Sequence, residues 1–283
     1  MNKKIIDNQE HIRIFYAVQT CDSKSYQNPK RYCSDSKTEV SKKCVTSFLQ
    51  SVKYCADLAP NTEHNIIIID DESTEELVDY LNKLVKKFSA EHIKINLVKL
   101  PKEYSGIAGS IKYCYEWMQN TSTENKDLVY QIQDDYMFDE RAIYEIISIW
   151  FQMYQETGTH AIVTPFNMSF MWLTHYRNWA SPRTVIVGEW RYWIQIYDCT
   201  CSWLTSREQF TQHWSLYYEF FRRIPLPDSV DFLENKSLNY MFTQRKVLGL
   251  TPVQSLAWHM QTEADKDPHV DWRPLWNSID INI

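Results

Sequence analysis

Glycine is scarce in this chain, which contains 5 glycines in 283 residues. Folds built on glycine-rich phosphate loops need this residue because it lets backbone amides approach the phosphates closely. The P-loop pattern G-x-x-x-x-G-K-S/T is also absent. The composition therefore argues against a fold of this kind.

Long apolar runs are absent as well. No run approaches the roughly 18 apolar residues that a membrane-spanning helix needs. The amino terminus, MNKKIIDNQEHIRIF, lacks the uninterrupted apolar core of a signal peptide. We therefore expect a soluble protein without a membrane span, which leaves peripheral contact with a membrane surface open.

The cysteines and the charges argue against two further classes. The 7 cysteines include one Cys-x-Cys, at Cys199 and Cys201, but no paired Cys-x-x-Cys of the kind that holds structural zinc. We interpret them as reduced thiols of a cytoplasmic protein. The formal charge of −6 offers none of the basic excess that nucleic-acid binding requires, so we expect no nucleic-acid partner.

Apolar and aromatic residues are plentiful. Hydrophobic residues make up 44% of the chain and aromatic residues 14%, including 11 tryptophans. This content is enough for a substantial core in one large domain or two small ones. We expect most of the tryptophans to pack in the core and a few to line a cleft.

Apolar strand patterns alternate with helix patterns over residues 12–165. The predicted strands are Arg13–Val18, Asn65–Ile69, Lys94–Leu100, Leu128–Gln133 and His160–Thr164. The predicted helices are Glu39–Ala56, a segment from Leu77 to Phe88, Ser105–Gln119 and Arg141–Tyr154. Because parallel strands need crossover connections, this order predicts an α/β fold with a mainly parallel, Rossmann-like central sheet and helices on both faces.

The second predicted helix carries a start signal. Ser73 and Glu76 have the spacing of a capping box, in which the serine accepts from the first-turn amides and the glutamate reaches back. The sequence thus predicts Ser73 as the residue that caps this helix.

The second half, residues 166–262, is aromatic-rich and has a less regular pattern. We expect an antiparallel strand at Glu189–Tyr197, helices at Arg207–Phe221 and Phe232–Gln244, and a strand at Val247–Leu250. No linker-like stretch separates the halves, so we predict a single domain with one shared core, followed by a tail at residues 263–283.

Two acidic pairs follow predicted strands. Asp70 and Asp71 come after Asn65–Ile69, and Asp134 and Asp135 come after Leu128–Gln133. The carboxyl ends of parallel strands share one edge of a sheet, where ligands bind. Carboxylates there can hold a hard divalent cation against a phosphate, so we expect one shared acidic crevice.

Four segments in order resemble the family 2 glycosyltransferases of the nucleotide-sugar-binding GT-A fold, over residues 12–262. They are the turn Tyr16–Asp22, the Asp-Asp-x-Ser stretch Asp70–Ser73, the helix-opening Gly106–Ser110, and Gln133–Tyr136 at the metal motif. The resemblance implies an inverting, metal-dependent enzyme. It would move a sugar from a nucleotide-diphosphate donor, a UDP-sugar by family frequency, to a hydroxyl of a glycan or other acceptor.

The resemblance also implies the residues of the donor and metal sites. The donor-binding candidates are Thr20, Asp70, Asp71, Gly106, Lys112 and Asp134. The candidates for binding Mn²⁺ or Mg²⁺ are Asp135 as direct ligand, Asp134 as supporting carboxylate and His259. The chain departs from the family at the metal motif, because Gln133 and Tyr136 flank the acidic pair and no strict Asp-x-Asp is present.

The catalytic base implied by the family falls in a stretch that also departs from its pattern. Phe232–Leu238 resembles the family's Glu-Asp-x-x-Leu, but Asn235 stands where the aspartate is expected, and an amide cannot take a proton. Glu234 and Asp231 are the two candidates. Trp203 and Trp190 are the candidates for contacting the acceptor sugar, because aromatic rings pack against the C–H faces of pyranoses.

Two other interpretations stay open. A sugar nucleotidyltransferase has a related sheet and acidic metal ligands, but that class places a glycine-rich loop and basic residues after the first strand, where this chain has Gln19–Asp22. A non-catalytic carbohydrate-binding or assembly protein on the same fold is the alternative that Asn235 and the missing Asp-x-Asp suggest.

Overall fold

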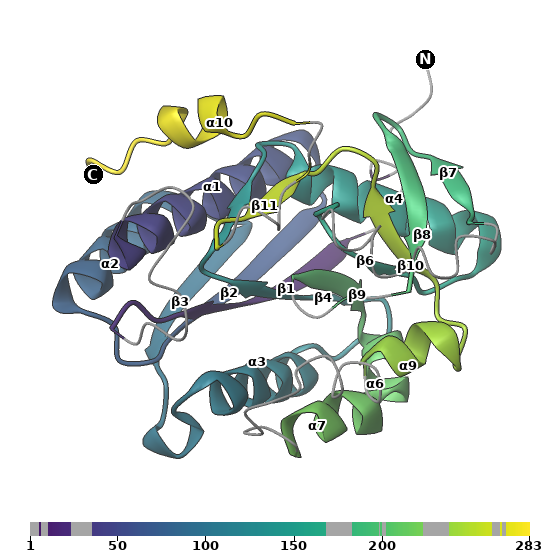
Figure 1. The fold of residues 1–283 in the computed structure, drawn as a ribbon, viewed down its shortest axis with the longest axis horizontal. Coiled ribbons are helices and arrows are strands. Elements are labelled where there is room, and N and C mark those ends of the chain that lie inside the picture. The colour runs from purple at the N-terminus through teal and green to yellow at the C-terminus, as the bar shows by residue number, and fades with distance from the viewer. Residues whose placement is uncertain are drawn as a thin grey trace.

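The structure is a computed structural model that describes residues 6, 11–23, 36–167, 183–197, 199, 202–222, 238–261, 267 and 270–283. These residues form a nine-stranded sheet with the order β3-β2-β1-β4-β9-β6-β10-β8-β7 (Figure 1). The strands are β1 (Ile12–Thr20), β2 (Thr62–Asp70), β3 (Ile93–Lys99), β4 (Leu128–Gln133), β6 (Ile162–Val163), β7 (Val185–Val187), β8 (Tyr192–Ile196), β9 (Trp203–Ser206) and β10 (Gly249–Pro252). A separate two-stranded sheet pairs β5 (Tyr136–Phe138) with β11 (Ala257–His259).

The first four strands of the large sheet are parallel. β1 lies between β2 and β4, and β2 pairs with β3 on its other side. The apolar run Ile66–Ile69 is buried on both faces of the sheet, as a central parallel strand requires. The predicted α/β class and the predicted parallel strands of the first half are confirmed.

The rest of the sheet mixes directions. β9 is antiparallel to both β4 and β6, and β8 is antiparallel to both β7 and β10, whereas β6 and β10 are parallel. The predicted antiparallel strand at 189–197 is confirmed as β8. Since β9 from the second half lies between β4 and β6 from the first half, a single sheet and a single apolar core join the two halves.

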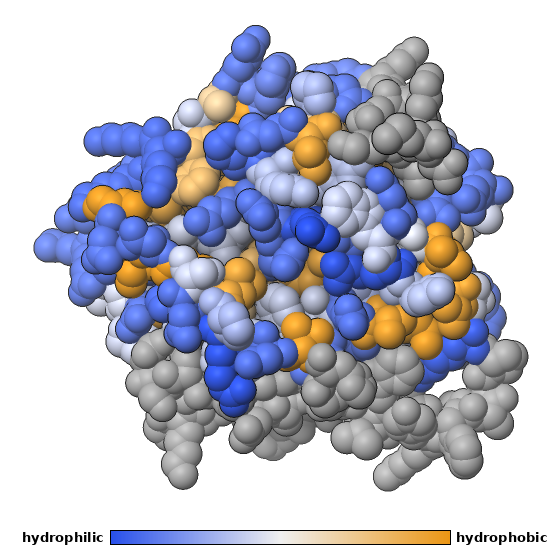
Figure 2. All heavy atoms as spheres, turned by 90° about the horizontal axis from the view of Figure 1, so that it is seen from above, coloured by the Kyte–Doolittle hydropathy of each residue, from blue (hydrophilic) through white to orange (hydrophobic). Residues whose placement is uncertain are grey.

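Helices cover both faces of the sheet, as predicted (Figure 1). One layer contains α1 (Lys37–Leu58), α2 (Glu75–Phe88) and α4 (Ala142–Thr157), and α1 contacts both of the others. The other contains α3 (Ile107–Thr121), α6 (Arg207–Gln212), α7 (Trp214–Arg222) and α9 (Leu238–Thr243). Figure 2, seen from above the first layer, shows mainly hydrophilic side chains with small separate apolar patches, as expected for the outer faces of amphipathic helices.

Two helix predictions need correction. Thr74, not Ser73, is the N-cap of α2: its hydroxyl accepts from the amide of Leu77, and the amide of Ser73 donates to Asp70 Oδ1 instead. The helix predicted over 207–221 is broken at His213, whose backbone leaves the helical region between α6 and α7.

The last residues pack on the outside of the first helix layer. α10 (Arg273–Ser278) places Trp276 in a second apolar cluster together with Val40 and Cys44 of α1. The Lys43 ammonium lies 4.4 Å from the centroid of the Trp276 ring. The described part of the predicted tail is therefore fixed to the domain.

Most of the cysteines that the structure describes are buried, namely Cys44, Cys55, Cys114 and Cys199. Burial raises the pKa of the Cys55 and Cys114 thiols above the ordinary value, which keeps both protonated. In the described part of the chain, no helix combines the length and apolar character that crossing a bilayer would take.

Candidate functional site

A cleft opens at the carboxyl ends of β1, β2 and β4, the edge to which both acidic pairs were assigned. Its lining residues are Gln19, Thr20, Cys21, Lys37, Asp71, Ile107, Ser110, Gln133, Asp134, Asp135 and Gln261. The parallel strands bring these side chains together although they are far apart in the sequence. The cleft is the candidate site for a phosphorylated ligand.

Asp71 ties the end of β2 to the start of α3. One carboxylate oxygen accepts from Ser105 Oγ at 3.0 Å, and the other accepts from the Gly106 amide at 2.9 Å. Gly106 has a φ of +97°, a conformation that side chains with a Cβ rarely adopt. A glycine is therefore needed at this point, and it fixes the direction of the Asp71 carboxylate at the cleft wall.

Asp70 and Thr20 hold the neighbouring backbone. Asp70 Oδ1 accepts from the Ser73 amide at 3.1 Å and so closes the turn before α2, in which Glu72 has a positive φ of 61°. Asp70 does not line the cleft, whereas Thr20 does. The Asp71 amide donates to the carbonyl of Thr20, which keeps the two strand ends in register.

Asp134 is surrounded by donors. Its carboxylate accepts from Lys37 Nζ at 2.5 Å, from Ser41 Oγ at 2.6 Å and from the Cys21 amide at 3.2 Å. Burial raises the pKa of Asp134 above its ordinary value; Lys37 acts in the opposite direction, and the adjacent Asp135 adds to the rise. The structure thus places Asp134 opposite the start of α1, where it holds Lys37 in the cleft.

Asp135 lies beside His259. Its Oδ2 is 3.4 Å from His259 Nε2, and both side chains are largely buried. The β5–β11 pairing sets His259 opposite Tyr136, and the two rings stack with centroids 4.7 Å apart. The Met260 amide also donates to the Asp135 carbonyl. The structure therefore brings together two residues that were predicted as metal ligands and that lie far apart in the sequence.

The donor set at this point suits a divalent cation only if the ligand completes it. Among the described residues, no group of three or more His, Cys, Asp or Glu side chains could hold a metal ion. A carboxylate oxygen and an imidazole nitrogen are present in the Asp135–His259 pair. Mg²⁺ is commonly held by one or two carboxylates together with substrate phosphates. The pair fits that type of site, with the remaining ligands supplied by a diphosphate.

Besides Asp70, the predicted site residues Lys112 and Trp203 also lie outside the cleft lining. Lys112 is on α3, 3.7 Å from Glu116 and over the ring of Tyr104, and it does not line the cleft. Trp203 is 1% exposed and packs against Tyr115 and other rings of the core. Such burial prevents contact with an acceptor sugar, so the assignment of Trp203 to the acceptor site is wrong.

Trp190 is the acceptor candidate that reaches solvent. It is 42% exposed, and the guanidinium of Arg141 lies 4.6 Å from its ring centroid. It precedes β8, and because β8 is antiparallel to β10, the start of β8 lies at the same sheet edge as the acidic cleft. The candidate bases Glu234 and Asp231 lie outside the described residues.

Several cleft residues were not predicted from the sequence. Lys37 and Ser41 occupy the first turns of α1 and contact Asp134, which is over 90 residues away. A chain of amides also crosses the sheet end: Gln131 Nε2 donates to Gln19 Oε1, and Gln19 Nε2 donates to Ser110 Oγ. The one local signal was the presence of polar residues on the buried side of a predicted strand and helix.

Comparison with known proteins gave likenesses in structure only. No protein-family model and no curated protein sequence matches the chain. A mannosyltransferase from Pyrobaculum calidifontis, solved with GDP-Man and Mn²⁺, is 13% identical with a TM-score of 0.41 and matches 73% of this chain and 48% of its own. The glycosyltransferase GlyE of Streptococcus pneumoniae is 8% identical with a TM-score of 0.48 and matches 96% of this chain and 60% of its own. A UDP-glucose pyrophosphorylase from Acinetobacter baumannii is 10% identical with a TM-score of 0.45 and matches 89% of both chains.

The chain thus spans about half the length of the mannosyltransferase and 60% of GlyE. Both are glycosyltransferases, the class that the sequence resembles. At these identities and TM-scores, we take neither a reaction nor a residue role from the matched proteins.

Proposed function

We propose that the protein is a glycosyltransferase that uses a nucleotide-diphosphate sugar as donor, with UDP as the expected nucleotide. The observation that carries this proposal is the acidic cleft at the carboxyl ends of parallel strands, which Asp71 and Asp135 line, with His259 beside Asp135. Such an edge is where α/β proteins bind phosphorylated ligands. The acceptor is expected to be a glycan or another hydroxyl compound.

Each cleft residue has a part in this proposal. Asp71, whose direction is set by Ser105 and Gly106, is placed to accept hydrogen bonds from the nucleoside. Lys37 is placed to contact the diphosphate, since its ammonium lies in the cleft beside Asp134. Trp190 is the proposed acceptor contact because it is exposed at the same edge.

Asp135 and His259 are the proposed ligands of Mn²⁺ or Mg²⁺. When bound, such an ion stabilises the charge that grows on a leaving diphosphate. Their fixed places on either side of the β5–β11 pairing mean that no large movement is needed to bring carboxylate and imidazole to one ion.

The proposed reaction is inverting and needs a base for the acceptor hydroxyl. Glu234 is the first candidate and Asp231 the second, on the strength of the family resemblance alone. Replacing the true base, as Glu234→Gln or Asp231→Asn, is expected to lower the transfer rate by about 10² to 10⁴. The variant with a normal rate identifies the residue that is not the base.

The test is release of nucleoside diphosphate from a panel of nucleotide sugars, with Mn²⁺ and with a chelator. Asp135→Asn is expected to lower metal-dependent release by about a hundredfold or more and to weaken Mn²⁺ binding measured by calorimetry. Asp57→Asn, at an exposed position on α1 that pairs with Lys53, is the control and should change neither quantity. If Asp135→Asn releases nucleoside diphosphate at the normal rate and binds Mn²⁺ unchanged, Asp135 is not a metal ligand.

A sugar nucleotidyltransferase is the second candidate. The observation in its favour is Lys37, a basic residue that enters the cleft from the first turn of α1, the helix that follows β1. Incubation with nucleoside triphosphates and sugar 1-phosphates separates the two, because this enzyme releases pyrophosphate and a glycosyltransferase does not. Donor binding without either product would instead support a non-catalytic binding protein.

A further inference from the structure

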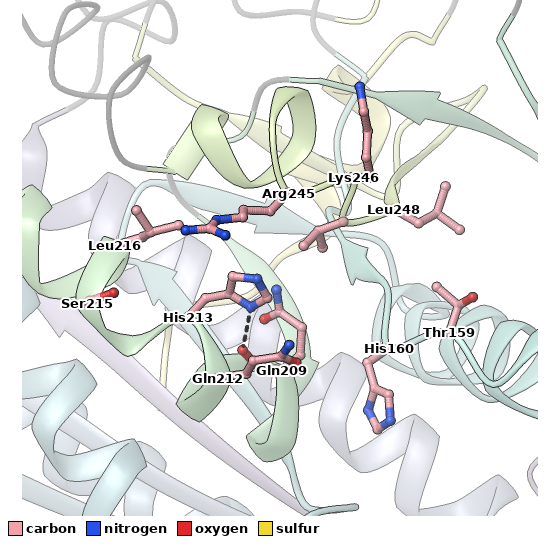
Figure 3. Close-up of a pocket in the computed structure, with 11 residues that line it drawn as sticks. Thr159, His160, Gln209, Gln212, His213, Ser215, Leu216, Arg245, Lys246 and Leu248 are labelled. Atoms are coloured by element: carbon pink, nitrogen blue, oxygen red, sulfur yellow. Dashed lines mark hydrogen bonds between the residues drawn. The ribbon is translucent and has the colours of Figure 1, made fainter.

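A second and larger cavity lies away from the acidic cleft. Its volume is about 540 Å³, within the range of small-molecule sites. Its walls come from the segment before β6, the α6–α7 junction and the segment between α9 and β10, as Figure 3 shows.

The strand directions place this cavity at the opposite edge of the sheet. His160 precedes β6 and Leu248 precedes β10. β4 is parallel to β1, and β4 and β6 are both antiparallel to β9. Since β10 is parallel to β6, the strands β4, β6 and β10 run in the same direction as β1. The cavity therefore lies at their amino ends, whereas the acidic cleft lies at their carboxyl ends. One ligand of monosaccharide size cannot reach both.

The cavity carries positive charge in a protein whose formal charge is −6. Arg245 and Lys246 lie at its wall, and among the described residues no carboxylate forms an ion pair with either of them. Figure 3 shows the Arg245 side chain extending toward His213 and Leu216, while Lys246 points away from them. Lys246 Nζ donates to the Thr243 carbonyl instead. Arg245 is thus the cation available to a ligand in the cavity.

Hydrogen-bonding groups surround this arginine. The His213 Nδ1 lies 3.1 Å from the Gln209 carbonyl (dashed in Figure 3), and because a carbonyl only accepts, Nδ1 carries the proton. In the neutral ring Nε2 is then an acceptor for a ligand hydroxyl. Gln212 and Ser215 add an exposed amide and an exposed hydroxyl to the same wall.

The remaining wall is apolar or already engaged. Leu216, Val247 and Leu248 give the cavity a surface that suits the C–H face of a sugar ring. His160 Nδ1 bonds Ser206 Oγ at 2.6 Å, and its Nε2 lies 3.7 Å from Glu208 Oε2, so this histidine forms the wall and is not counted among the ligand contacts.

We propose that this cavity binds a small anionic carbohydrate, a sugar bearing a phosphate or a carboxylate, with Arg245 holding the anionic group. Guanidinium matches the geometry of either oxyanion, and the acceptors and donors at His213, Gln212 and Ser215 match ring hydroxyls. The site is separate from the acidic cleft and does not depend on the reaction proposed there.

The test is calorimetric titration with glucose 6-phosphate, glucuronate, glucose and inorganic phosphate. At least one of the two anionic sugars is expected to bind more tightly than glucose and more tightly than inorganic phosphate. Arg245→Gln should weaken that binding about tenfold to a hundredfold, the effect of losing one charge-assisted contact. Arg273→Gln, a similarly exposed arginine on α10, is the matched control and should bind like the unaltered protein.

Further results would overturn the proposal. If glucose binds as tightly as both anionic sugars, the anionic group plays no part in binding. If inorganic phosphate binds as tightly as both, the sugar ring plays no part. If a folded Arg245→Gln variant binds the anionic sugar with unchanged affinity, Arg245 does not hold the ligand. Loss of binding in Asp135→Asn would show that the ligand occupies the acidic cleft, whereas unchanged binding there supports a separate site even if no transferase activity is found.

Discussion

Acid is expected to destabilise this protein through one buried histidine, His64 on β2. Its Nε2 lies 2.9 Å from Thr62 Oγ1 and its Nδ1 lies 2.8 Å from the Tyr16 hydroxyl. Thr62 already donates to the Ala59 carbonyl, so its oxygen accepts from Nε2–H, and Nδ1 accepts from Tyr16. A second proton on Nδ1 would put a charge in a fully buried site and leave the Tyr16 hydroxyl proton without its acceptor.

The size of the effect follows from the pKa of His64, which burial lowers from 6.5 to about 3. The unfolded chain takes the proton near pH 6.5 and the folded chain only near pH 3, so stability is intact above the first value and falls progressively toward the second. At about pH 4.5, two units below the unfolded pKa, this histidine is expected to cost about 2 to 3 kcal/mol of stability.

The assay is urea denaturation of the unaltered protein and of His64→Gln at about pH 7 and about pH 4.5, since the variant cannot bind this proton. Acid effects at other groups are common to both proteins, so the difference between their free energies of unfolding should shrink by about 2 to 3 kcal/mol on acidification. The prediction is refuted if the difference in the free energy of unfolding between the unaltered protein and His64→Gln stays constant. It is also refuted if the His64 imidazole titrates near pH 6.5 in the NMR spectrum.

Three further outcomes are expected from substitutions. Arg191→Gln leaves the buried Glu145 carboxylate without its bidentate partner and should lower the free energy of unfolding by about 3 kcal/mol, measured in urea; an unchanged value would contradict the pair. Gly106→Ala strains a positive φ and moves the amide that Asp71 accepts from, so nucleotide affinity measured by calorimetry should fall with little loss of helix content; unaltered affinity would count against that turn. Trp203→Ala should cost about 3 to 5 kcal/mol of stability, and an equally stable variant that only loses acceptor use would contradict its placement in the core.

The parallel half of the sheet could be predicted because its signals are local. An apolar run with β-branched residues, such as 66–69, has to be covered on both faces, and the helix periods between such runs supply the cover. The strand predicted at 128–133 has the same bounds as β4. Each acidic pair directly follows a predicted strand in the sequence. Because parallel strands end at the same edge of a sheet, the sequence alone placed both pairs at that edge.

The cleft residues that were missed depend on contacts between distant segments. Lys37 has no partner near it in the sequence that would mark it as a cleft residue, and its pairing with Asp134 arises only when α1 packs beside the end of β4. His259 was predicted from the family resemblance, but the β5–β11 pairing that brings it to Asp135 was not, because a three-residue strand is too short to show a hydrophobic period. Trp203 was assigned to the acceptor site because the residue type alone does not show whether a tryptophan is buried in the core or lines a cleft.

The sequence by itself determined the α/β class, the parallel order of the first strands and the edge at which the acidic residues gather, because hydrophobic period and strand direction are properties of short segments. Only the tertiary structure decided that β9 enters between β4 and β6, that Asp134 faces Lys37, and that a second cavity forms at the opposite edge. These depend on which distant surfaces bury each other, and burial is a property of the folded chain as a whole.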